Sequence, residues 1–336
     1  MRAIVYSETG PSSVLRLVER PEPTAGPGEV VVRVVRSGVN PTDWKHRAGT
    51  GLSTPGGEVG PGHDGAGVVE AVGPGVDHVG TGDRVWLLLA GTGPVHGTAA
   101  ELTVQPANRV VPLPDGASFD LGAALGVPFI TAHRSLTSGT VPRLAAGALA
   151  GQTVLVAGGA GAVGNAAIQL ARWAGATVIT TVSSAEKAAL ARAAGAHHVV
   201  NYREGDPAAE ILAAAPAGVD LIAEVAPAAN IALDLAVAGN HGTVAIYAEN
   251  GGNEVMLPAQ AAMGKNLRFA FAVLYTLDEA LVQAAVEDLT AALADDALRV
   301  GEAAGLPLHH YNLANTADAH DAVERGTIGK VLLDLG

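Results

Sequence analysis

The first 120 residues alternate between short apolar runs rich in β-branched residues and clusters of proline, glycine, aspartate and asparagine. This pattern is typical of short β-strands joined by turns, because branched side chains suit a pleated sheet and the cluster residues suit turns. The strands expected here are Ala3–Tyr6, Val14–Val18, Glu29–Val35, Gly67–Val72, Arg84–Leu89 and Ala100–Val104. Many short strands at this spacing predict a sandwich or a partly open barrel.

After Gly151 the pattern changes to apolar runs that alternate with segments of helical periodicity. The expected strands are Thr153–Ala157, Thr177–Val182, His197–Val200, Val219–Val225, Thr243–Tyr247 and Leu267–Val273. The expected helices are Ala162–Ala174, Ser184–Ala194, Pro207–Ala215, Ala228–Ala236 and Asp278–Leu293. Strands joined through helices imply parallel pairing, so this half predicts an α/β fold with a doubly wound parallel sheet.

Two changes in the residue pattern along the chain suggest where the domain boundaries lie. Pro112, Pro114 and Gly116 mark a boundary that is followed by a helical stretch, and the last 40 residues return to strand and turn signals. A terminal segment of this kind can rejoin the first domain, which would then be discontinuous. We therefore expect one domain over residues 1–120 plus 275–336 and a second over residues 121–274.

Composition and charge narrow the function classes for this chain of 336 residues. It contains no cysteine, which excludes disulfides, cysteine zinc sites, thiol nucleophiles and iron–sulfur clusters. Its net charge of −13 disfavours nucleic acid and anionic lipid as partners, so a phosphate ligand must be held by a local arrangement. The N-terminal residues lack the layout of a signal peptide, and we expect a cytoplasmic protein.

One uncharged stretch of 21 residues, from Leu144 to Gly164, is long enough to suggest a membrane helix. Its β-rich part, Thr153–Ala157, is only as long as a strand, and the remainder consists mostly of alanine and glycine. A buried strand that enters a glycine loop fits this stretch better than a membrane span does.

The strongest local signal is the glycine-rich run from Gly158 to Gly164. It matches G-x-G-x-x-G through Gly159, Gly161 and Gly164, follows a clean strand and opens an apolar helix. Glycines at these places permit a tight turn and allow the backbone to approach a pyrophosphate at the positive end of the helix. A turn that serves only strand–helix packing is the alternative.

The end of the next strand indicates which dinucleotide is bound. NAD sites usually carry Asp or Glu about 20 residues after the loop, whereas Ser183 stands 19 residues after Gly164. Ser183 and Ser184 can donate hydrogen bonds to a 2′-phosphate, and Lys187 supplies a cation one turn into the helix. A serine N-cap and a solvated lysine are the alternatives. The pattern favours NADPH.

Several segments together resemble a known family. They are Ser37–Asp43, Gly62–Val69, Gly82–Val85, Thr131–Ala132, Gly158–Gly164, Asn201–Glu204 and Gly329–Lys330. The chain is similar over essentially its whole length to the zinc-independent quinone oxidoreductases, the zeta-crystallin type, of the medium-chain dehydrogenase/reductase superfamily. The resemblance implies a Rossmann domain inserted into a GroES-like β-rich domain, an active site in the cleft between them, and a homodimer.

The family's residue roles carry over by position. Asn40 would lie near the nicotinamide, Thr131 near its ribose, and Gly161, Ala162 and Val163 near the pyrophosphate, with Gly158 and Gly164 shaping the loop. Ser183, Lys187 and Tyr202 would surround the 2′-phosphate, and Lys330 matches a C-terminal position near the cofactor. Asn40 as a turn former, Thr131 as a helix residue and Tyr202 as packing are the alternatives.

The zinc-dependent relatives bind zinc through Cys, His and Cys with a nearby Glu. This chain has Asn40 at the position of the first Cys, although His63 and Asp64 stand in the matching motif. We therefore expect no metal. Many quinone reductases carry a Tyr five residues after that Asn, where this chain has Lys45, which leaves the substrate open.

Metal-free hydride transfer suits a conjugated acceptor, because conjugation spreads the developing negative charge without a Lewis acid. Water or a cleft side chain, Lys45, Trp44 or His63, would then protonate or hydrogen-bond the oxygen. We expect an NADPH-dependent reductase of quinones or related conjugated carbonyls. The alternatives are an ene-reductase for 2-enals, 2-enones or enoyl thioesters and, less favoured by the charge, a non-catalytic nucleotide- or RNA-binding protein.

Overall fold

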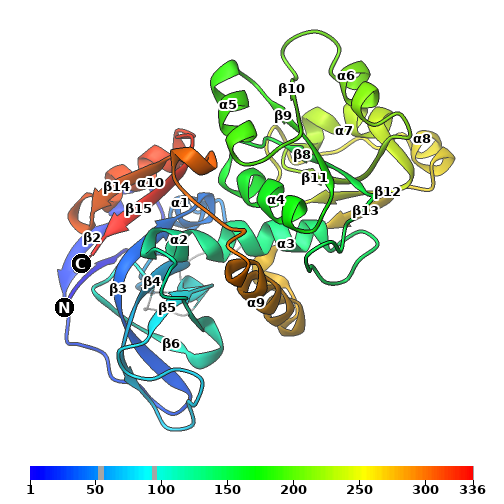
Figure 1. Ribbon diagram of the computed structural model, residues 1–336. Coiled ribbons are helices and arrows are strands. Elements are labelled where there is room, and N and C mark those ends of the chain that lie inside the picture. Colours follow the sequence, from blue (N-terminus) through cyan, green and yellow to red (C-terminus); the bar gives the residue numbers. More distant parts are fainter. Residues whose placement is uncertain (52–56, 93–96, 336) are drawn as a thin grey trace. The chain divides into compact units, whose positions relative to one another are not determined.

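The computed structural model describes residues 1–51, 57–92 and 97–335, which fold into two compact units. The first unit combines Met1–Val127 with Leu308–Gly336, and the second spans Pro128–Pro307 (Figure 1). The first unit is thus discontinuous. The expected return at residue 275 differs from the structure, because helix α9 (Glu279–Ala294) is tied into the second unit through Asp288, whose carboxylate binds His133 and Arg143.

The first unit contains one large mixed sheet and a separate two-stranded ribbon. The strands are β1 (Arg2–Val5), β2 (Arg16–Glu19), β3 (Glu29–Val39), β4 (Asp64–Val72), β5 (Arg84–Leu87), β6 (Leu102–Pro106), β7 (Val110–Pro112), β14 (Leu308–Asn312) and β15 (Lys330–Asp334). The helices are α1 (Pro41–Ala48), α2 (Phe119–Ala124) and α10 (Thr316–Glu324). The sheet order is β14-β15-β3-β4-β5-β7, and β6 also pairs with β3.

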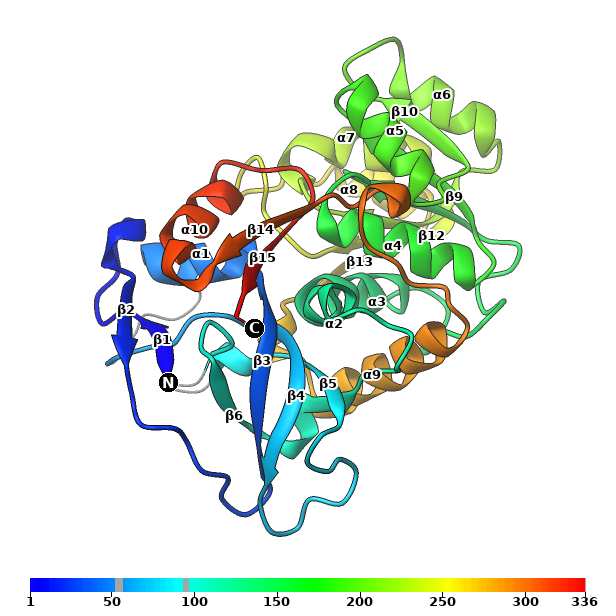
Figure 2. The ribbon, with the colours of Figure 1, turned by 60° about the vertical axis from the view of Figure 1, so that its left-hand side comes forward.

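The C-terminal strand completes the sheet of the first unit. β15 pairs antiparallel with β3, so that Leu332 lies opposite Gly38, and α1 packs against α10 (Figure 2). The valines of β3 alternate between the two faces of the sheet, and Val30, Val32 and Val34 join a buried cluster with Val69 and Val85. Val31, on the opposite face, is 2% exposed, so this part of β3 is buried on both faces.

The second unit is a six-stranded parallel sheet with helices (Figure 1). Its strands are β8 (Thr153–Ala157), β9 (Thr177–Val182), β10 (His198–Asn201), β11 (Val219–Glu224), β12 (Ala238–Ile246) and β13 (Arg268–Phe271). Its helices are α3 (Ile130–Leu136), α4 (Ala162–Trp173), α5 (Ala185–Ala193), α6 (Pro207–Ala214), α7 (Pro227–Val237), α8 (Ala259–Gly264) and α9. The order β10-β9-β8-β11-β12-β13 is the Rossmann order, with its reversal between β8 and β11.

Some elements were not predicted from the sequence. α1, β7, α3 and α8 were missed, and β12 begins five residues before the expected Thr243. A π-helical turn, Leu125–Phe129, stands between α2 and α3 at the point where the chain passes from the first unit to the second. The uncharged stretch before Gly164 is strand β8 and its loop, and among the described residues no helix has the length and apolarity to cross a bilayer.

Candidate active site

The glycine loop leaves the carboxyl end of β8, where the strand order reverses. β8 lies between β9 and β11, and α4 begins at Ala162 directly after the loop, with Gly161 as its N-cap. The first backbone N–H groups of a helix have no partner within the helix and carry its positive dipole end. Ala162, Val163 and Gly164 therefore present amides at the place where parallel sheets bind anionic ligands.

Each glycine of this loop has a different reason to be there. Gly158 has a φ of +71°, a conformation that suits glycine. A Cβ at Gly164 would lie 2.3 Å from the carbonyl oxygen of Gly158, and one at Gly159 would lie 2.1 Å from Oγ1 of Thr180. A Cβ at Gly161 would meet nothing closer than 3.4 Å. The protein's own packing does not require glycine at Gly161, which is consistent with a ligand that approaches the backbone there.

The carboxyl end of β9 brings together the residues predicted for the 2′-phosphate. Nζ of Lys187 donates to Oγ of Ser183 at 3.1 Å, and the backbone N–H of Tyr202 donates to the carbonyl of Val182 at 3.0 Å. Tyr202 is 47% exposed, a large surface for a tyrosine ring. Oγ of Ser184 accepts from the backbone N–H of Lys187 at 3.3 Å, so Ser184 is the N-cap of α5. Ser183, Lys187 and Tyr202 thus form one group with no acidic member.

A second group of site residues lies in the first unit and surrounds a buried lysine. Nζ of Lys330 donates to Oδ1 of Asn40 at 2.7 Å and lies 3.2 Å from Oδ2 of Asp64. Nδ2 of Asn40 donates to the same oxygen of Asp64 at 2.8 Å. All three side chains are at most 2% exposed. Burial raises the pKa of Asp64, while the ammonium of Lys330 and the amide of Asn40 act in the opposite direction.

Helix α1 positions the other residues predicted to be catalytic. The carboxylate of Asp43 accepts from the backbone N–H of Asn40 at 2.7 Å and from that of Gly62 at 3.2 Å, which joins the start of α1 to the segment before β4. Trp44 and Lys45 are half-buried in the middle of α1. Burial raises the pKa of Asp43 to about 6, although its hydrogen bonds and Lys330 lower it.

His63 precedes β4 and is 3% exposed, with its ring 5.6 Å from that of His46 in an edge-to-face arrangement. Burial lowers the pKa of His63 to about 4, and the negative charge of Asp64 only partly compensates. At neutral pH His63 is therefore an uncharged imidazole. It therefore lacks the second ring proton of an imidazolium, which a general acid would donate.

Thr131 lies in the first turn of α3 and is half-buried, with its carbonyl accepting from Oγ of Ser135 at 2.9 Å. The helix is fixed to α9, since Nε2 of His133 lies 2.8 Å from Oδ2 of Asp288. The same carboxylate accepts from Nε of Arg143 at 2.9 Å and from the backbone N–H of Leu144 at 2.7 Å. This network fixes the position of α3, and nothing in the sequence pattern pointed to it.

A buried pair of carboxyl groups stands beside the glycine loop. Glu224 ends β11, the neighbour of β8, and binds the side chain of Asn230 at 3.0 Å. Asp234 of α7 is 1% exposed, and burial together with the adjacent Glu224 holds its pKa far above the ordinary value. Burial and the neighbouring carboxyl group both favour the protonated form of Asp234.

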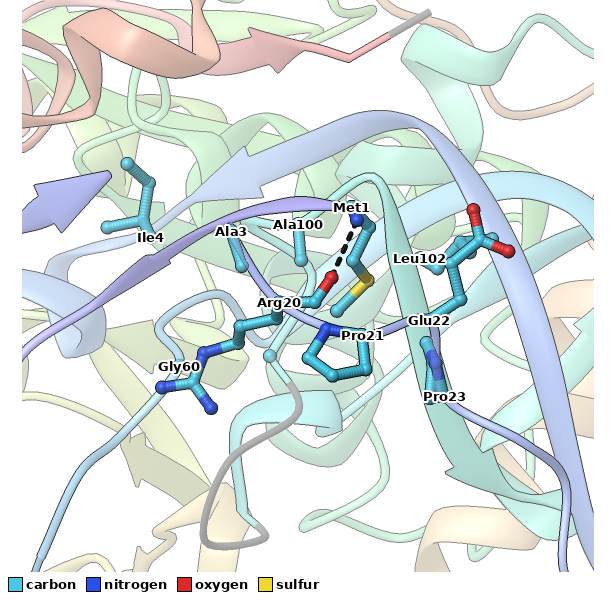
Figure 3. A pocket seen from close by; sticks show the side chains of 11 residues that line it. Met1, Ala3, Ile4, Arg20, Pro21, Glu22, Pro23, Gly60, Ala100 and Leu102 are labelled. Carbon is cyan, nitrogen blue, oxygen red and sulfur yellow. Dashed lines mark hydrogen bonds between the residues drawn. The ribbon is translucent and has the colours of Figure 1, made fainter. Parts of the chain in front are cut away.

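Two further observations bear on ligands. Within residues 1–51, 57–92 and 97–335, no three His, Asp or Glu side chains gather closely enough to hold a metal ion. A cavity of about 230 Å³ in the first unit is lined by Met1, Arg20 and Leu102, among others, and contains none of the predicted site residues. Figure 3 shows the α-amino group of Met1 donating to the carbonyl of Arg20 beside it.

Comparisons with known proteins bear on the family and the fold of both units. Residues 26–115 match the family model described as the alcohol dehydrogenase GroES-like domain, and residues 162–291 match the one described as zinc-binding dehydrogenase. The quinone oxidoreductase of Lama guanicoe is 33% identical over 99% of this chain and 97% of its own length. A mycobacterial protein solved in complex with NADPH has a TM-score of 0.82 at 31% identity, covering 99% of both chains. The CurK enoyl reductase has a TM-score of 0.83 at 25% identity, covering 99% of this chain and 98% of its own.

The glycine loop at the switch point of a Rossmann sheet, joined to a GroES-like unit, defines an oxidoreductase of the medium-chain dehydrogenase/reductase superfamily. Within that superfamily, the chain belongs to the quinone oxidoreductase family. The expected fold class and the resemblance drawn from the sequence are thereby confirmed.

Proposed function

We propose that this enzyme transfers a hydride from NADPH to a quinone or a related conjugated carbonyl, without a metal. The observation that carries the proposal is the pairing of the open glycine loop with the acid-free group of Ser183, Lys187 and Tyr202. The related mycobacterial protein in complex with NADPH supports the cofactor, and the quinone oxidoreductases support the acceptor.

The residues present fit this cofactor. The amides of Ala162–Gly164 would face the pyrophosphate, and Gly161 would leave room for it. The ammonium of Lys187 can turn from Ser183 to the 2′-phosphate, while the exposed ring of Tyr202 offers a flat surface for the adenine. When bound, NADPH supplies the hydride. By the family pattern, Asn40 and Thr131 would hold the nicotinamide end, and Lys330 would act there through Asn40, to whose Oδ1 its ammonium donates.

The acceptor's oxygen gains negative charge as it is reduced, and the protein must supply a hydrogen bond or a proton. His63 is buried and uncharged at neutral pH, so we assign the proton to water or to Lys45. Trp44, next to Lys45 on α1, provides a flat apolar surface for a ring. Asn40, where zinc relatives have Cys, is engaged with Asp64 and Lys330, which supports chemistry without a metal.

The test is NADPH oxidation against a panel of quinones, 2-enals, 2-enones and enoyl thioesters. Turnover that is fastest with quinones is the expected result. The similarity to the CurK enoyl reductase favours a second candidate, an ene-reductase, which would show a higher kcat/KM on the enals, enones or thioesters. Tight NADPH binding without turnover of any acceptor would contradict both candidates.

Cofactor choice is tested at Lys187. We expect Lys187→Ala to raise the KM for NADPH about 10- to 100-fold, because it removes a charge-assisted hydrogen bond to the 2′-phosphate. The KM for NADH should stay unchanged, since NADH has no phosphate there. Arg192→Ala, which removes an exposed cation from the other end of α5, is the matched control and should alter neither value. Equal effects on both cofactors would disprove the assignment.

We also propose a homodimer that forms along the β13 edge of the parallel sheet and works in the cytoplasm without nucleic acid. β13 is the last strand in its sheet order, and Met263, Phe271 and Val273 are large exposed apolar side chains around it. A free apolar strand edge invites pairing with a second copy. The charge of −13 and the absence of cysteine support the other two proposals.

Phe271→Asp is expected to convert this dimer to a monomer, because it places a charge in the edge-to-edge contact. Sedimentation velocity at micromolar concentration measures the change. Leu17→Asp, at an exposed apolar position of the first unit, is the control and should sediment as the wild type does. A wild-type monomer, or a Phe271→Asp dimer, would show that this edge is not the interface.

A further inference from the structure

The buried lysine of the first unit fixes the side chain of Asn40 in one orientation. Oδ1 of Asn40 accepts from Nζ of Lys330, and its Nδ2 donates to Oδ2 of Asp64. An inverted amide would place a donor against the ammonium and an acceptor against the carboxylate. Both ends of the amide are thus satisfied in only one of its two orientations.

The surrounding backbone leaves space for these side chains through two glycines. A Cβ at Gly38 of β3 would lie 2.9 Å from Nζ of Lys330 and 2.2 Å from the carbonyl oxygen of Ala123. A Cβ at Gly126 would lie 2.1 Å from Oδ1 of Asp64. The charged pair is thus buried in closely fitted space. Buried charges are rare unless they are paired, so a specific arrangement of this kind needs a reason.

The second carboxylate oxygen of Asp64 makes a contact outside this group. Oδ1 accepts from the backbone N–H of Val127 at 2.7 Å. Val127 lies in the π-helical turn Leu125–Phe129, and the chain enters the second unit at the next residue. π-Helical turns are uncommon and are frequent at functional sites. One carboxylate therefore holds both the amide of Asn40 and the turn from which the chain continues toward Thr131.

We propose that Asp64 and Lys330 are positioning residues for hydride transfer, which act by fixing the Asn40 amide and by anchoring the π-helical turn Leu125–Phe129. The inference rests on the proposed function, because it concerns the residue assigned to the nicotinamide end. Neither side chain needs to touch the cofactor or the acceptor. Their loss should reduce the rate of hydride transfer and leave the binding of NADPH, which the glycine loop and Lys187 provide, unchanged.

The two charges must be removed together, since a single substitution would leave the other charge buried without its partner. We expect the double variant Asp64→Asn, Lys330→Met to fold and to bind NADPH as the wild type does, with the Kd measured by fluorescence. Its kcat should fall about 10- to 100-fold, which is the order of loss that a misplaced reacting group produces. A kcat that remains at the wild-type value in the double variant overturns the proposal.

A coupling cycle tests whether the pair acts through Asn40. Asn40→Ala should lower kcat by a similar factor, and adding it to the double variant should lower kcat no further, because residues that act through one another are not additive. Full additivity would show that the pair acts independently of Asn40. Lys265→Met is the control: this ammonium donates to the backbone carbonyls of Leu235, Ala236 and Ala238, so its loss should lower stability and not kcat.

Hydrogen exchange separates this inference from the proposed function. If none of the tested acceptors supports NADPH oxidation by the wild type, the proposed function fails. The anchoring of the π-helical turn is then judged from hydrogen exchange alone. The amide of Val127 should exchange slowly in the wild type and faster in the variant Asp64→Leu, Lys330→Met, because leucine, unlike asparagine, offers its N–H no acceptor, while amides of β8 stay unchanged. Equal exchange at Val127 in both proteins overturns the anchoring.

Discussion

Gly161→Val is expected to abolish NADPH binding without lowering the melting temperature. The Cβ position at Gly161 is open, its φ is −79°, and its nearest neighbour is the carbonyl oxygen of Gly158 at 3.4 Å. A Cβ therefore fits the protein, and we expect the valine side chain to occupy the space that the pyrophosphate needs. We expect the Kd for NADPH to rise at least about 100-fold, which corresponds to about 3 kcal/mol.

Gly164 provides the contrast within the same loop. A Cβ there would meet the backbone of Gly158 and Gly159, at 2.3 Å and 2.9 Å, so Gly164→Ala should lower both stability and binding. Overpacking of this kind costs about 1–3 kcal/mol. Gly116→Val, at an open position in the first unit, controls for the substitution itself. Cofactor titration and thermal unfolding measure the set, and normal NADPH affinity in Gly161→Val would show that the cofactor does not approach this backbone.

Asp288→Ala is expected to lower the free energy of unfolding by about 3–5 kcal/mol, the usual cost of breaking a buried ionic contact. The carboxylate is 5% exposed and binds His133, Arg143 and the backbone N–H of Leu144. Its removal leaves buried donors without an acceptor. Glu287→Ala, on the next residue of the same helix, breaks an exposed contact to Arg143 and should cost less than about 1 kcal/mol.

The same residue predicts a dependence on pH. Burial raises the pKa of Asp288, but the hydrogen bonds from His133, Arg143 and Leu144 outweigh it and lower the pKa to about 2 from the ordinary 3.8. A carboxyl whose pKa falls on folding stabilises the protein fully above its unfolded pKa and loses that contribution as pH falls toward the folded one. Urea unfolding at pH 7 and at pH 2–3 should therefore show that the stability deficit of Asp288→Ala, relative to the wild type, shrinks in acid. A deficit that is the same at both values would contradict this account.

The parallel sheet was predicted well because its signals are local. β8 and β9 have the expected bounds, since each is a β-branched run closed by glycine or a polar cluster. β12 was expected too late in the chain because Gly239 and Gly242 interrupt its apolar pattern. A Cβ at Gly239 would lie 2.9 Å from the carbonyl oxygen of Ala217. Gly239 therefore allows a close backbone approach within the strand, although in the sequence it suggested a turn.

The cofactor side of the site could be predicted for the same reason, since Ser183 and Lys187 are four residues apart. The network around Asn40 could not. Lys330 lies 290 residues from Asn40 and 266 from Asp64, and only the pairing of β15 with β3 brings them together. Its sequence position suggested a cofactor contact, and the structure places its ammonium on Asn40 and Asp64. The contact of Asp288 with His133 was not predicted either, because these residues lie 155 positions apart in the sequence. The end of the second unit at Pro307 was missed for the same reason.

The discontinuity of the first unit affects the order in which the two units can fold during synthesis. The second unit is one continuous segment, Pro128–Pro307, and can acquire its fold while synthesis continues. The sheet of the first unit lacks β14 and β15 until translation reaches residues 308–334, so β3 waits for a partner that is made nearly 300 residues later. Lys330 arrives with that strand. The nascent enzyme can therefore have a folded dinucleotide-binding unit before it has Lys330 beside Asn40.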